Sequence, residues 1–191
     1  MLNEYLLLDG ISEMRDFFRK KGRIVDIKKD DFFFRKDILC KCAGYIQKGA
    51  FRYITYTSAG KPLIVGYSFE NDFVADYGSF QNRTKTIVHA QAIEDCTVFT
   101  ITLDELNHYY DTCQDNHFRS RVAETLLAEI YDRLISLYCD TPEERYINLI
   151  TQHPELLRMI SLKEIASFIG VTPETLSRIR KNIVSNPKYS N

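Results

Sequence analysis

Two helix starts with a helix stop between them lie within residues 161–181, whose sequence is SLKEIASFIGVTPETLSRIRK. Ser161 and Glu164 have the spacing of a capping box, in which the two side chains satisfy backbone N–H groups reciprocally. Gly170 stands where a helix commonly ends in a left-handed residue. Thr172 and the proline after it then supply an N-cap and a first helical residue. The segment therefore predicts two short helices joined by a tight turn.

The apolar residues of both helices recur at intervals of three and four, so each helix has one face to bury. These residues are Leu162, Ile165, Ala166 and Ile169 in the first helix and Leu176, Ile179 and Ile183 in the second. The outward residues of the second helix are Glu174, Ser177, Arg178, Arg180 and Lys181. Such a pair forms a helix-turn-helix, whose second helix enters the major groove of DNA. A small helical domain with a merely solvated cationic face has the same pattern, so the pattern alone leaves both interpretations open.

The order of residues from Ile165 to Arg178, IAxxIGVTxxTLSR, is more specific than this pattern. It closely resembles the DNA-binding helix pair of the superfamily of bacterial transcription regulators that contains the cyclic-AMP receptor protein and Fnr (Crp/Fnr). The resemblance implies that Glu174 and Arg178 contact bases, because glutamate accepts from cytosine and arginine donates to guanine. Pro173 stands where the cyclic-AMP receptor has a basic base reader. The residues that we expect on the DNA backbone are Thr172, Thr175, Ser177, Arg180 and Lys181.

The overall composition is that of an ordinary globular protein, since 45% of the 191 residues are hydrophobic and 27% are charged. Such a chain can bury one core or divide into two small domains. The N-terminal MLNEYLLLDG has a short apolar run that suits neither a signal peptide nor a membrane span, so we expect a cytoplasmic protein without a membrane partner. The formal net charge is −1. The C-terminal residues nevertheless carry Arg178, Arg180, Lys181 and Lys188 against Glu174 alone, which favours phosphate contact at one surface.

The five cysteines are an odd number scattered along the chain, which suits reduced thiols better than a disulfide framework. Cys40 and Cys42 would point to the same side of a strand, but two ligands do not close a tetrahedral zinc site. Iron–sulfur members of the superfamily have a cysteine cluster near the N-terminus, and nothing before Cys40 matches it. We therefore expect no metal site.

The first part of the chain predicts one helix and then a β-roll. Residues 11–21 have apolar residues at helical spacing. From residue 22 to residue 102 the sequence changes to short runs rich in Ile, Val, Phe, Tyr and Thr, broken by turn residues, which is typical of antiparallel strands in a small barrel or jelly roll. The clearest hairpin turn lies at 58–62. The resemblance implies a cyclic-nucleotide-binding-like effector domain over residues 1–112.

Helical spacing returns at Leu103, and residues 118–140 contain neither glycine nor proline. An apolar seam with the alternating spacing of a coiled coil runs along this stretch, so residues 113–140 predict a dimerisation helix that also packs on its own barrel. The expected interface residues are Ala123, Leu127, Ile130, Leu134 and Leu137. TPEE from Thr141 is another capped start, so a hinge and domain boundary is expected at 139–142, with the helix-turn-helix domain over 141–191. The fold class is α+β.

Cyclic nucleotide binding in this superfamily depends on a glycine–glutamate pair for the ribose and an arginine–serine pair for the cyclic phosphate. The resemblance aligns Ala75 and Asp76 with the first pair, and Thr84 and Lys85 with the second. A lysine is a point charge without the planar fork of a guanidinium, so the change is not conservative. Arg83 is one residue away, but on a strand its side chain would face the other side. We expect no response to cyclic AMP.

The effector region has two interpretations, which the sequence leaves open. It holds either another small molecule or the protein's own Phe and Tyr side chains. The candidate effector residues are Asp76, Thr84, Lys85, His89 and Glu129. Glu129 and Ile130 occupy the positions where the cyclic-AMP receptor offers hydroxyls to the adenine. His89 is favoured as a packed barrel residue over a haem ligand.

The predicted function is a homodimeric regulator that binds a near-palindromic DNA site and acts on RNA polymerase. After Ile183 only VSNPKYSN remains, too short for the two-stranded wing that normally follows the recognition helix, so the wing is expected to be reduced or absent, leaving at most Lys188. The rival from another class is a ligand-sensing or protein-interaction module without DNA binding. An enzyme is the weakest alternative, because no Ser–His–Asp, paired-carboxylate or phosphate-loop arrangement stands out.

Overall fold

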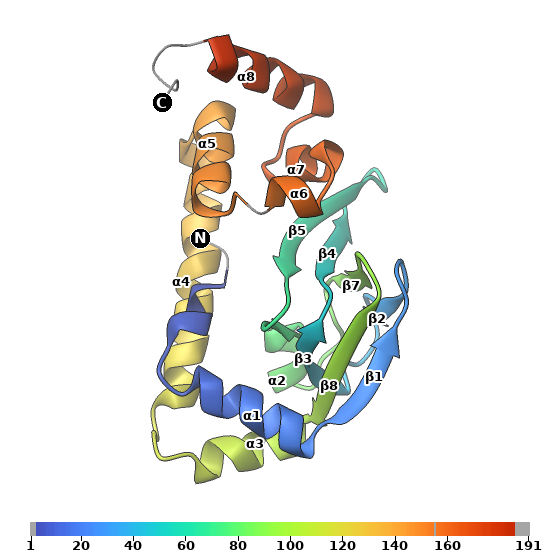
Figure 1. Cartoon of the computed structure of the whole chain (residues 1–191), viewed down its shortest axis with the longest axis vertical. Coiled ribbons are helices and arrows are strands. Elements are labelled where there is room, and N and C mark those ends of the chain that lie inside the picture. The colour runs from blue at the N-terminus through green and yellow to red at the C-terminus, as the bar shows by residue number, and fades with distance from the viewer. Residues whose placement is uncertain (1–2, 155, 186–191) are drawn as a thin grey trace. The chain divides into compact units, whose positions relative to one another are not determined.

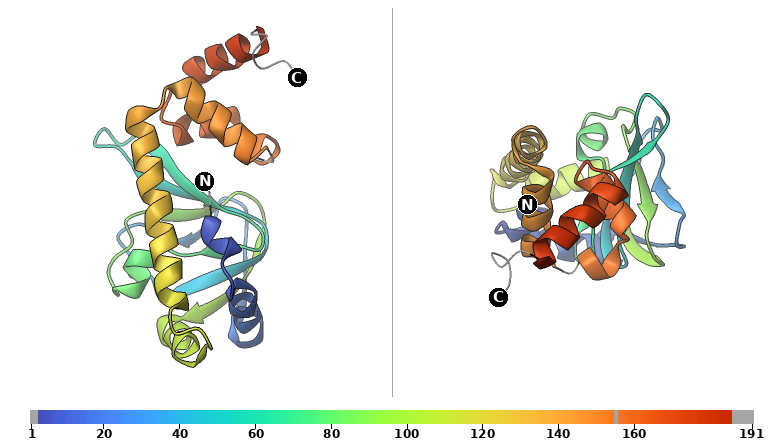
Figure 2. Two further views of the ribbon diagram at one scale, coloured as in Figure 1. Left: turned by 90° about the vertical axis from the view of Figure 1, so that its left-hand side faces the viewer. Right: turned by 90° about the horizontal axis from the view of Figure 1, so that it is seen from above.

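The computed structural model describes residues 3–154 and 156–185 (Figure 1). The chain divides into two compact units, which meet in the sequence between Ala128 and Glu129. Helix α4 (Phe118–Cys139) crosses this point as one continuous helix (Figure 2). The finer division into residues 1–112, 113–140 and 141–191 remains a prediction.

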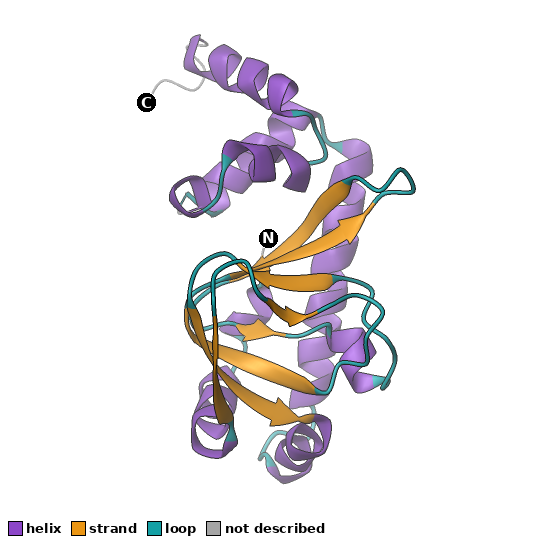
Figure 3. Ribbon diagram, turned by 90° about the vertical axis from the view of Figure 1, so that its right-hand side faces the viewer, coloured by secondary structure: helices purple, strands orange, loops and turns teal. Residues whose placement is uncertain are grey.

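The N-terminal unit contains two antiparallel sheets of four strands each (Figure 3). Its strands are β1 (Arg23–Ile27), β2 (Phe32–Phe34), β3 (Cys42–Lys48), β4 (Phe51–Tyr56), β5 (Pro62–Ser68), β6 (Phe73–Val74), β7 (His89–Ala92) and β8 (Cys96–Thr102). The strand orders are β1-β8-β3-β6 and β2-β7-β4-β5. Its helices are the 3-10 helix η1 (Glu4–Leu7), α1 (Ile11–Lys21), α2 (Tyr77–Gln81) and α3 (Leu103–Thr112). The predicted β-roll and the helix over 11–21 are confirmed, whereas α2 was not predicted.

The core of the roll is aromatic and aliphatic, and it lies between the two sheets. Tyr45, Ile46, Phe51 and Val98 are fully buried members of one hydrophobic cluster. Tyr45 and Ile46 follow one another on β3 and would normally face opposite sides. Both are buried because α1 contacts β3 and β8. The large side chains therefore fill the interior of the roll and the space under α1.

The hairpin between β4 and β5 turns where the sequence predicts it. Thr57 N donates to Lys61 O at 2.9 Å, and Gly60 has a φ of +74°, which only glycine adopts at little cost.

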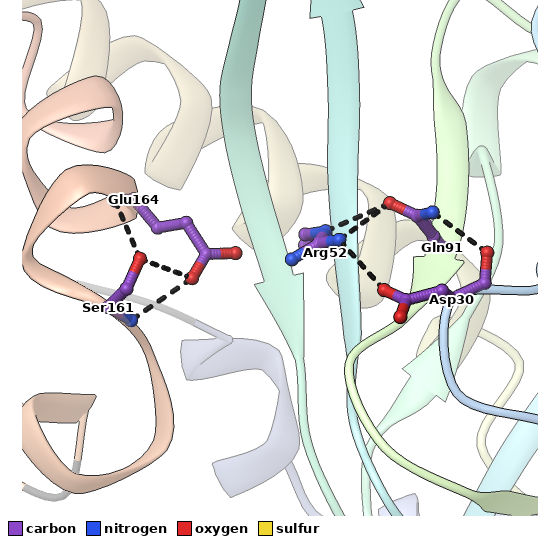
Figure 4. Close-up of polar contacts among 5 residues, drawn as sticks. All are labelled: Asp30, Arg52, Gln91, Ser161 and Glu164. Carbon is purple, nitrogen blue, oxygen red and sulfur yellow. Dashed lines mark hydrogen bonds and ion pairs between the residues drawn. The ribbon is translucent and has the colours of Figure 1, made fainter.

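On the same sheet, Arg52 of β4 donates to the side-chain oxygen of Gln91 on β7 at 2.8 and 3.0 Å and pairs with Asp30 at 3.3 Å (Figure 4). A charged side chain within the sheet is thereby held by neighbouring elements.

A buried carboxylate joins the N-terminal segment to the start of β6. Asp72 accepts hydrogen bonds from Asn3 Nδ2 at 2.6 Å, from the Tyr5 hydroxyl, and from Phe73 N at 2.6 Å. Its side chain is almost fully buried, and desolvation raises its pKa from 3.8 to about 6 despite these donors. This acid therefore links the 3-10 helix η1 and the residue before it to the roll.

The C-terminal unit consists of helices. Besides the second half of α4 it contains α5 (Pro142–Gln152), α6 (Leu156–Met159), α7 (Leu162–Phe168) and α8 (Pro173–Ser185). Its small core includes Tyr146, Leu149, Leu156, Ile165 and Leu176, all of which are buried. The capped start predicted at residue 141 is confirmed, since Thr141 and Glu144 form a complete capping box.

Among the described residues, every helix is too short or too polar to cross a lipid bilayer. The predicted reduced or absent wing, including Lys188, falls on residues 186–191 and lies outside the described part of the chain.

Asp72 should make the stability of the roll depend on pH. Because its pKa is raised in the folded state, its contribution is fully present below the unfolded pKa of 3.8 and is lost as pH rises through about 6. The free energy of unfolding of the wild type, relative to that of Asp72→Asn, should therefore fall by about 2.5 kcal/mol between pH 4 and pH 8. Denaturant titrations at several pH values measure this difference. Asp111→Asn, at an exposed acid, is the control, and a difference for Asp72→Asn that stays constant with pH would contradict the assignment.

Candidate nucleic-acid interface and effector region

Helix α7 begins as the sequence predicts. Ser161 N donates to Glu164 Oε2 at 3.0 Å, and Glu164 N donates to Ser161 Oγ at 3.3 Å (Figure 4). The capping box is thus reciprocal, and it satisfies two N–H groups that the helix itself cannot pair. With only seven residues, α7 depends on such partners at both ends.

The turn after α7 is built around Gly170, which has a φ of +74°. Val171 N donates to Ala166 O at 2.9 Å and Gly170 N donates to Ser167 O at 3.2 Å, which is the pairing of a Schellman motif. Two residues later Thr172 accepts from Thr175 N at 3.2 Å through its side chain, so α8 starts at once. The predicted helix, glycine turn and second helix are confirmed.

Helix α8 buries its apolar stripe and leaves its polar face exposed. Leu176 and Ile179 are buried, and Ile183 is half-buried. The exposed residues proposed for DNA contact are Thr172, Glu174, Ser177, Arg178, Arg180 and Lys181, while Thr175 is half-buried with its hydroxyl 3.2 Å from that of Thr172. Glu174 and Arg178 are four residues apart and therefore lie on the same side of the helix. The structure leaves both accessible to a partner.

The effector candidate Asp76 is already engaged by the backbone. Its carboxylate caps α2 by accepting from Ser79 N at 3.2 Å, and it also accepts from Ile87 N at 2.9 Å. These two bonds explain why a short helix interrupts the strands here, since an N-cap aspartate favours a helix start. The side chain that the resemblance aligns with the ribose-binding pair thus stabilises the fold of its own loop.

The residues after α2 are not on a strand, which corrects an assumption of the sequence analysis. Arg83 has a left-handed backbone with a φ of 52°, and its guanidinium pairs with Asp104 at 2.6 Å. Thr84 and Lys85 are exposed, and Lys85 forms only an isolated bridge with Leu39. The turn arises because Thr84 N and Arg83 N donate to the end of α2. The direction of the Arg83 side chain, toward Asp104, is therefore set by this turn and not by the alternation of a strand.

His89 is packed among aromatic rings on β7. Its ring lies 5.5 Å from that of Phe32 and 5.6 Å from that of Tyr56, centroid to centroid, and its Nδ1 accepts from Lys36 N at 3.2 Å. Partial burial and the nearby Arg35 lower its pKa, so the neutral imidazole is favoured. Glu129, the remaining effector candidate, belongs to the C-terminal unit.

An open pocket of about 430 Å³ lies beside β2, and the sequence analysis did not single it out. Its lining is Phe32, Phe33, Phe34, Arg35, Ile38, Leu39, Cys40, Lys41 and Cys42. Cys40 precedes β3 rather than lying on it, and burial raises the pKa of its thiol to about 11. The only signal for this pocket in the sequence is the aromatic run of residues 32–34 before two basic residues, and a buried strand would have the same run.

Three comparisons relate the chain to known proteins. Residues 24–113 match the profile of the cyclic nucleotide-binding domain. The transcriptional activator protein Anr of Pseudomonas aeruginosa is 26% identical over 175 residues, which covers 84% of this chain and 69% of Anr. Because that alignment covers 84% of the chain, it extends well beyond residues 24–113. Both likenesses agree with the resemblance to the Crp/Fnr superfamily that the helix pair indicates.

Solved structures share the fold of this chain. FixK2 from Bradyrhizobium japonicum has a TM-score of 0.71 at 18% identity, covering 86% of this chain and 85% of FixK2. The c-di-GMP responsive global regulator CLP of Xanthomonas campestris has a TM-score of 0.68 at 15% identity, covering 91% of this chain and 92% of CLP. Anr and CLP are named as regulators rather than as enzymes. The resemblance inferred from the helix pair is confirmed.

Proposed function

We propose that this chain is a regulator of the Crp/Fnr type that binds DNA as a homodimer, with the exposed face of α8 in the major groove. The observation that carries the proposal is that the polar, cationic face of α8 is exposed. Arg178, Arg180 and Lys181 are exposed on a helix whose opposite side is buried through Leu176 and Ile179. A cationic surface on a firmly seated helix suits phosphate and base contacts together.

Glu174 and Arg178 are proposed as the residues that read sequence. A glutamate accepts from cytosine N4, and an arginine donates two hydrogen bonds to guanine O6 and N7. Thr172, Thr175, Ser177, Arg180 and Lys181 would hold the helix on the DNA backbone. Backbone contacts set the position of the helix, whereas the two base readers set the sequence preference.

The exposed stripe of α4 supports a homodimer. Leu127 and Ile130 are 67% and 66% exposed, and Leu134 and Leu137 are also exposed. Large apolar side chains in a row on one helix are costly in water and are typical of an interface. A parallel pair of α4 helices related by a twofold axis would bury them as a coiled-coil seam. Two α8 helices about 34 Å apart would then meet a near-palindromic site.

The effector, if one binds, is proposed to be a small molecule other than cyclic AMP. The carboxylate of Asp76 already accepts hydrogen bonds from Ser79 N and Ile87 N. Thr84 stands where the resemblance places the family's arginine. An effector would act by favouring the dimer geometry that matches the DNA. We further propose that the dimer acts in the cytoplasm on RNA polymerase at promoters, where bound DNA and polymerase meet.

Replacement of Arg178 by alanine tests the base-reading assignment. Affinity for the preferred DNA site should fall by about 1–3 kcal/mol, whereas affinity for unrelated DNA should change little. Fluorescence anisotropy over a range of salt concentrations measures both. Arg158→Ala, at an exposed arginine of α6, is the charge-matched control. Equal losses on both DNAs would refute base reading, and a wild type without salt-dependent DNA affinity would favour the interaction-module alternative.

Leu134→Asp tests the proposed dimer interface. A charge in the apolar seam should leave a monomer of 22.3 kDa, because burying an unpaired carboxylate opposes association. Sedimentation velocity of the wild type should give twice this mass. Asp132→Lys, which changes an exposed charge on another side of α4, should leave the dimer intact. A wild type that stays monomeric at micromolar concentration would contradict the interface.

Calorimetry with cyclic AMP tests the effector proposal. The titration should show no saturable heat, because Lys85 lacks the fork of a guanidinium and Asp76 already accepts from two backbone donors. Thermal unfolding with and without the nucleotide provides the control, since a ligand of the native state raises the melting temperature. Micromolar binding would overturn the proposal.

A further inference from the structure

The last carbonyls of α7 have two kinds of partner. The carbonyls of Ala166 and Ser167 accept from the backbone of the Schellman turn, as described above. Those of Phe168 and Ile169 each accept from an arginine of another helix. The C-terminal end of a helix carries partial negative charge, so cations are favoured there. Both arginines therefore hold the segment that joins α7 to α8.

Arg133 reaches this segment from the second half of α4. Its Nη2 donates to Phe168 O at 2.9 Å, and its guanidinium carbon lies 3.6 Å from the centre of the Phe168 ring. One side chain thus combines a charge-assisted hydrogen bond with a stacking contact on the same residue. A lysine can supply the charge but cannot reproduce the planar contact.

Arg145 reaches the same segment from the first turn of α5. Its Nε donates to Ile169 O at 2.9 Å, and its Nη1 donates to Asp140 O at 2.6 Å. Asp140 directly follows the last residue of α4, where a hinge was expected. One guanidinium therefore connects the end of α4 with the end of α7 across that hinge.

We propose that Arg133 and Arg145 are positioning residues that hold α8 at a fixed angle to the second half of α4. This inference rests on the proposed function, because that half of α4 carries Ile130, Leu134 and Leu137 of the proposed dimer seam. All of these elements belong to the same compact unit, and α7 packs against α8. If the seam fixes the twofold axis, the two arginines fix the distance and rotation between the two α8 helices. They thereby set which half-site spacing the dimer accepts.

Half-site spacing separates this role from a purely structural one. Each base pair added between two half-sites rotates one of them by about 35° relative to the other. A rigid dimer should bind one spacing well and its neighbours poorly, whereas a loosened dimer should tolerate several. A variant that is merely less stable would lose affinity for all spacings alike.

The test uses the full chain with Arg133→Met and Arg145→Met on duplexes whose half-sites are moved apart in steps of one base pair. Each variant should bind the optimal spacing about tenfold more weakly, with a smaller loss at other spacings, so that the preference flattens. The salt dependence of binding should stay unchanged, because the phosphate contacts remain. Arg158→Met is the matched control and should keep the wild-type profile.

Arg133→Lys keeps the test decisive if a methionine variant fails to fold. It retains a cation beside Phe168 O without the ring contact, so its preference should lie between those of the wild type and Arg133→Met. A folded variant with the wild-type spacing profile, or with an equal loss at every spacing, would overturn the inference. A wild type that binds no DNA would instead overturn the proposed function.

Discussion

Helix α7 has only seven residues, so most of its backbone N–H and carbonyl groups must find partners outside the helix. The capping box of Ser161 and Glu164 supplies them at one end, and the Gly170 turn supplies them at the other. The left-handed conformation of Gly170 is what allows α8 to begin within three residues and to point its apolar stripe inward. The cationic face of α8 is exposed as a consequence. The proposed DNA contact therefore depends on how one very short helix ends.

The β-roll keeps the fold of the cyclic nucleotide-binding domain, and large side chains pack inside it. Its interior is occupied by large side chains such as Tyr45, Phe51 and Phe80. Asp76, which the resemblance aligns with the ribose-binding pair, caps α2. Retention of the roll together with a changed loop is consistent with a regulator that answers to a different signal or to none.

The sequence predicts elements whose signals are local. The helix over residues 11–21, the hairpin near Gly60 and the capped helix starts at Thr141 and Ser161 each depend on residues a few positions apart, and the structure confirms them. Helix α2 could not be predicted, because a helix of five residues is too short to show a helical period in the sequence. The side-chain direction of Arg83 was assigned from a strand that does not exist there.

Contacts between distant residues could not be predicted in the same way. Arg133 and Phe168 are 35 residues apart, and Arg145 and Ile169 are 24 apart, so no spacing rule pairs them. The pocket beside β2 was missed because an aromatic run also describes a buried strand. The base-reading and dimer residues rest on the resemblance and on exposure, and they remain predictions.

Selection of bound fragments from a random DNA pool with the purified protein tests the central claim most directly. The account predicts enrichment of an inverted repeat whose two half-sites lie about 34 Å apart, on one face of the duplex. No enrichment, or enrichment of a single unpaired half-site, would contradict a twofold pair of α8 helices on DNA.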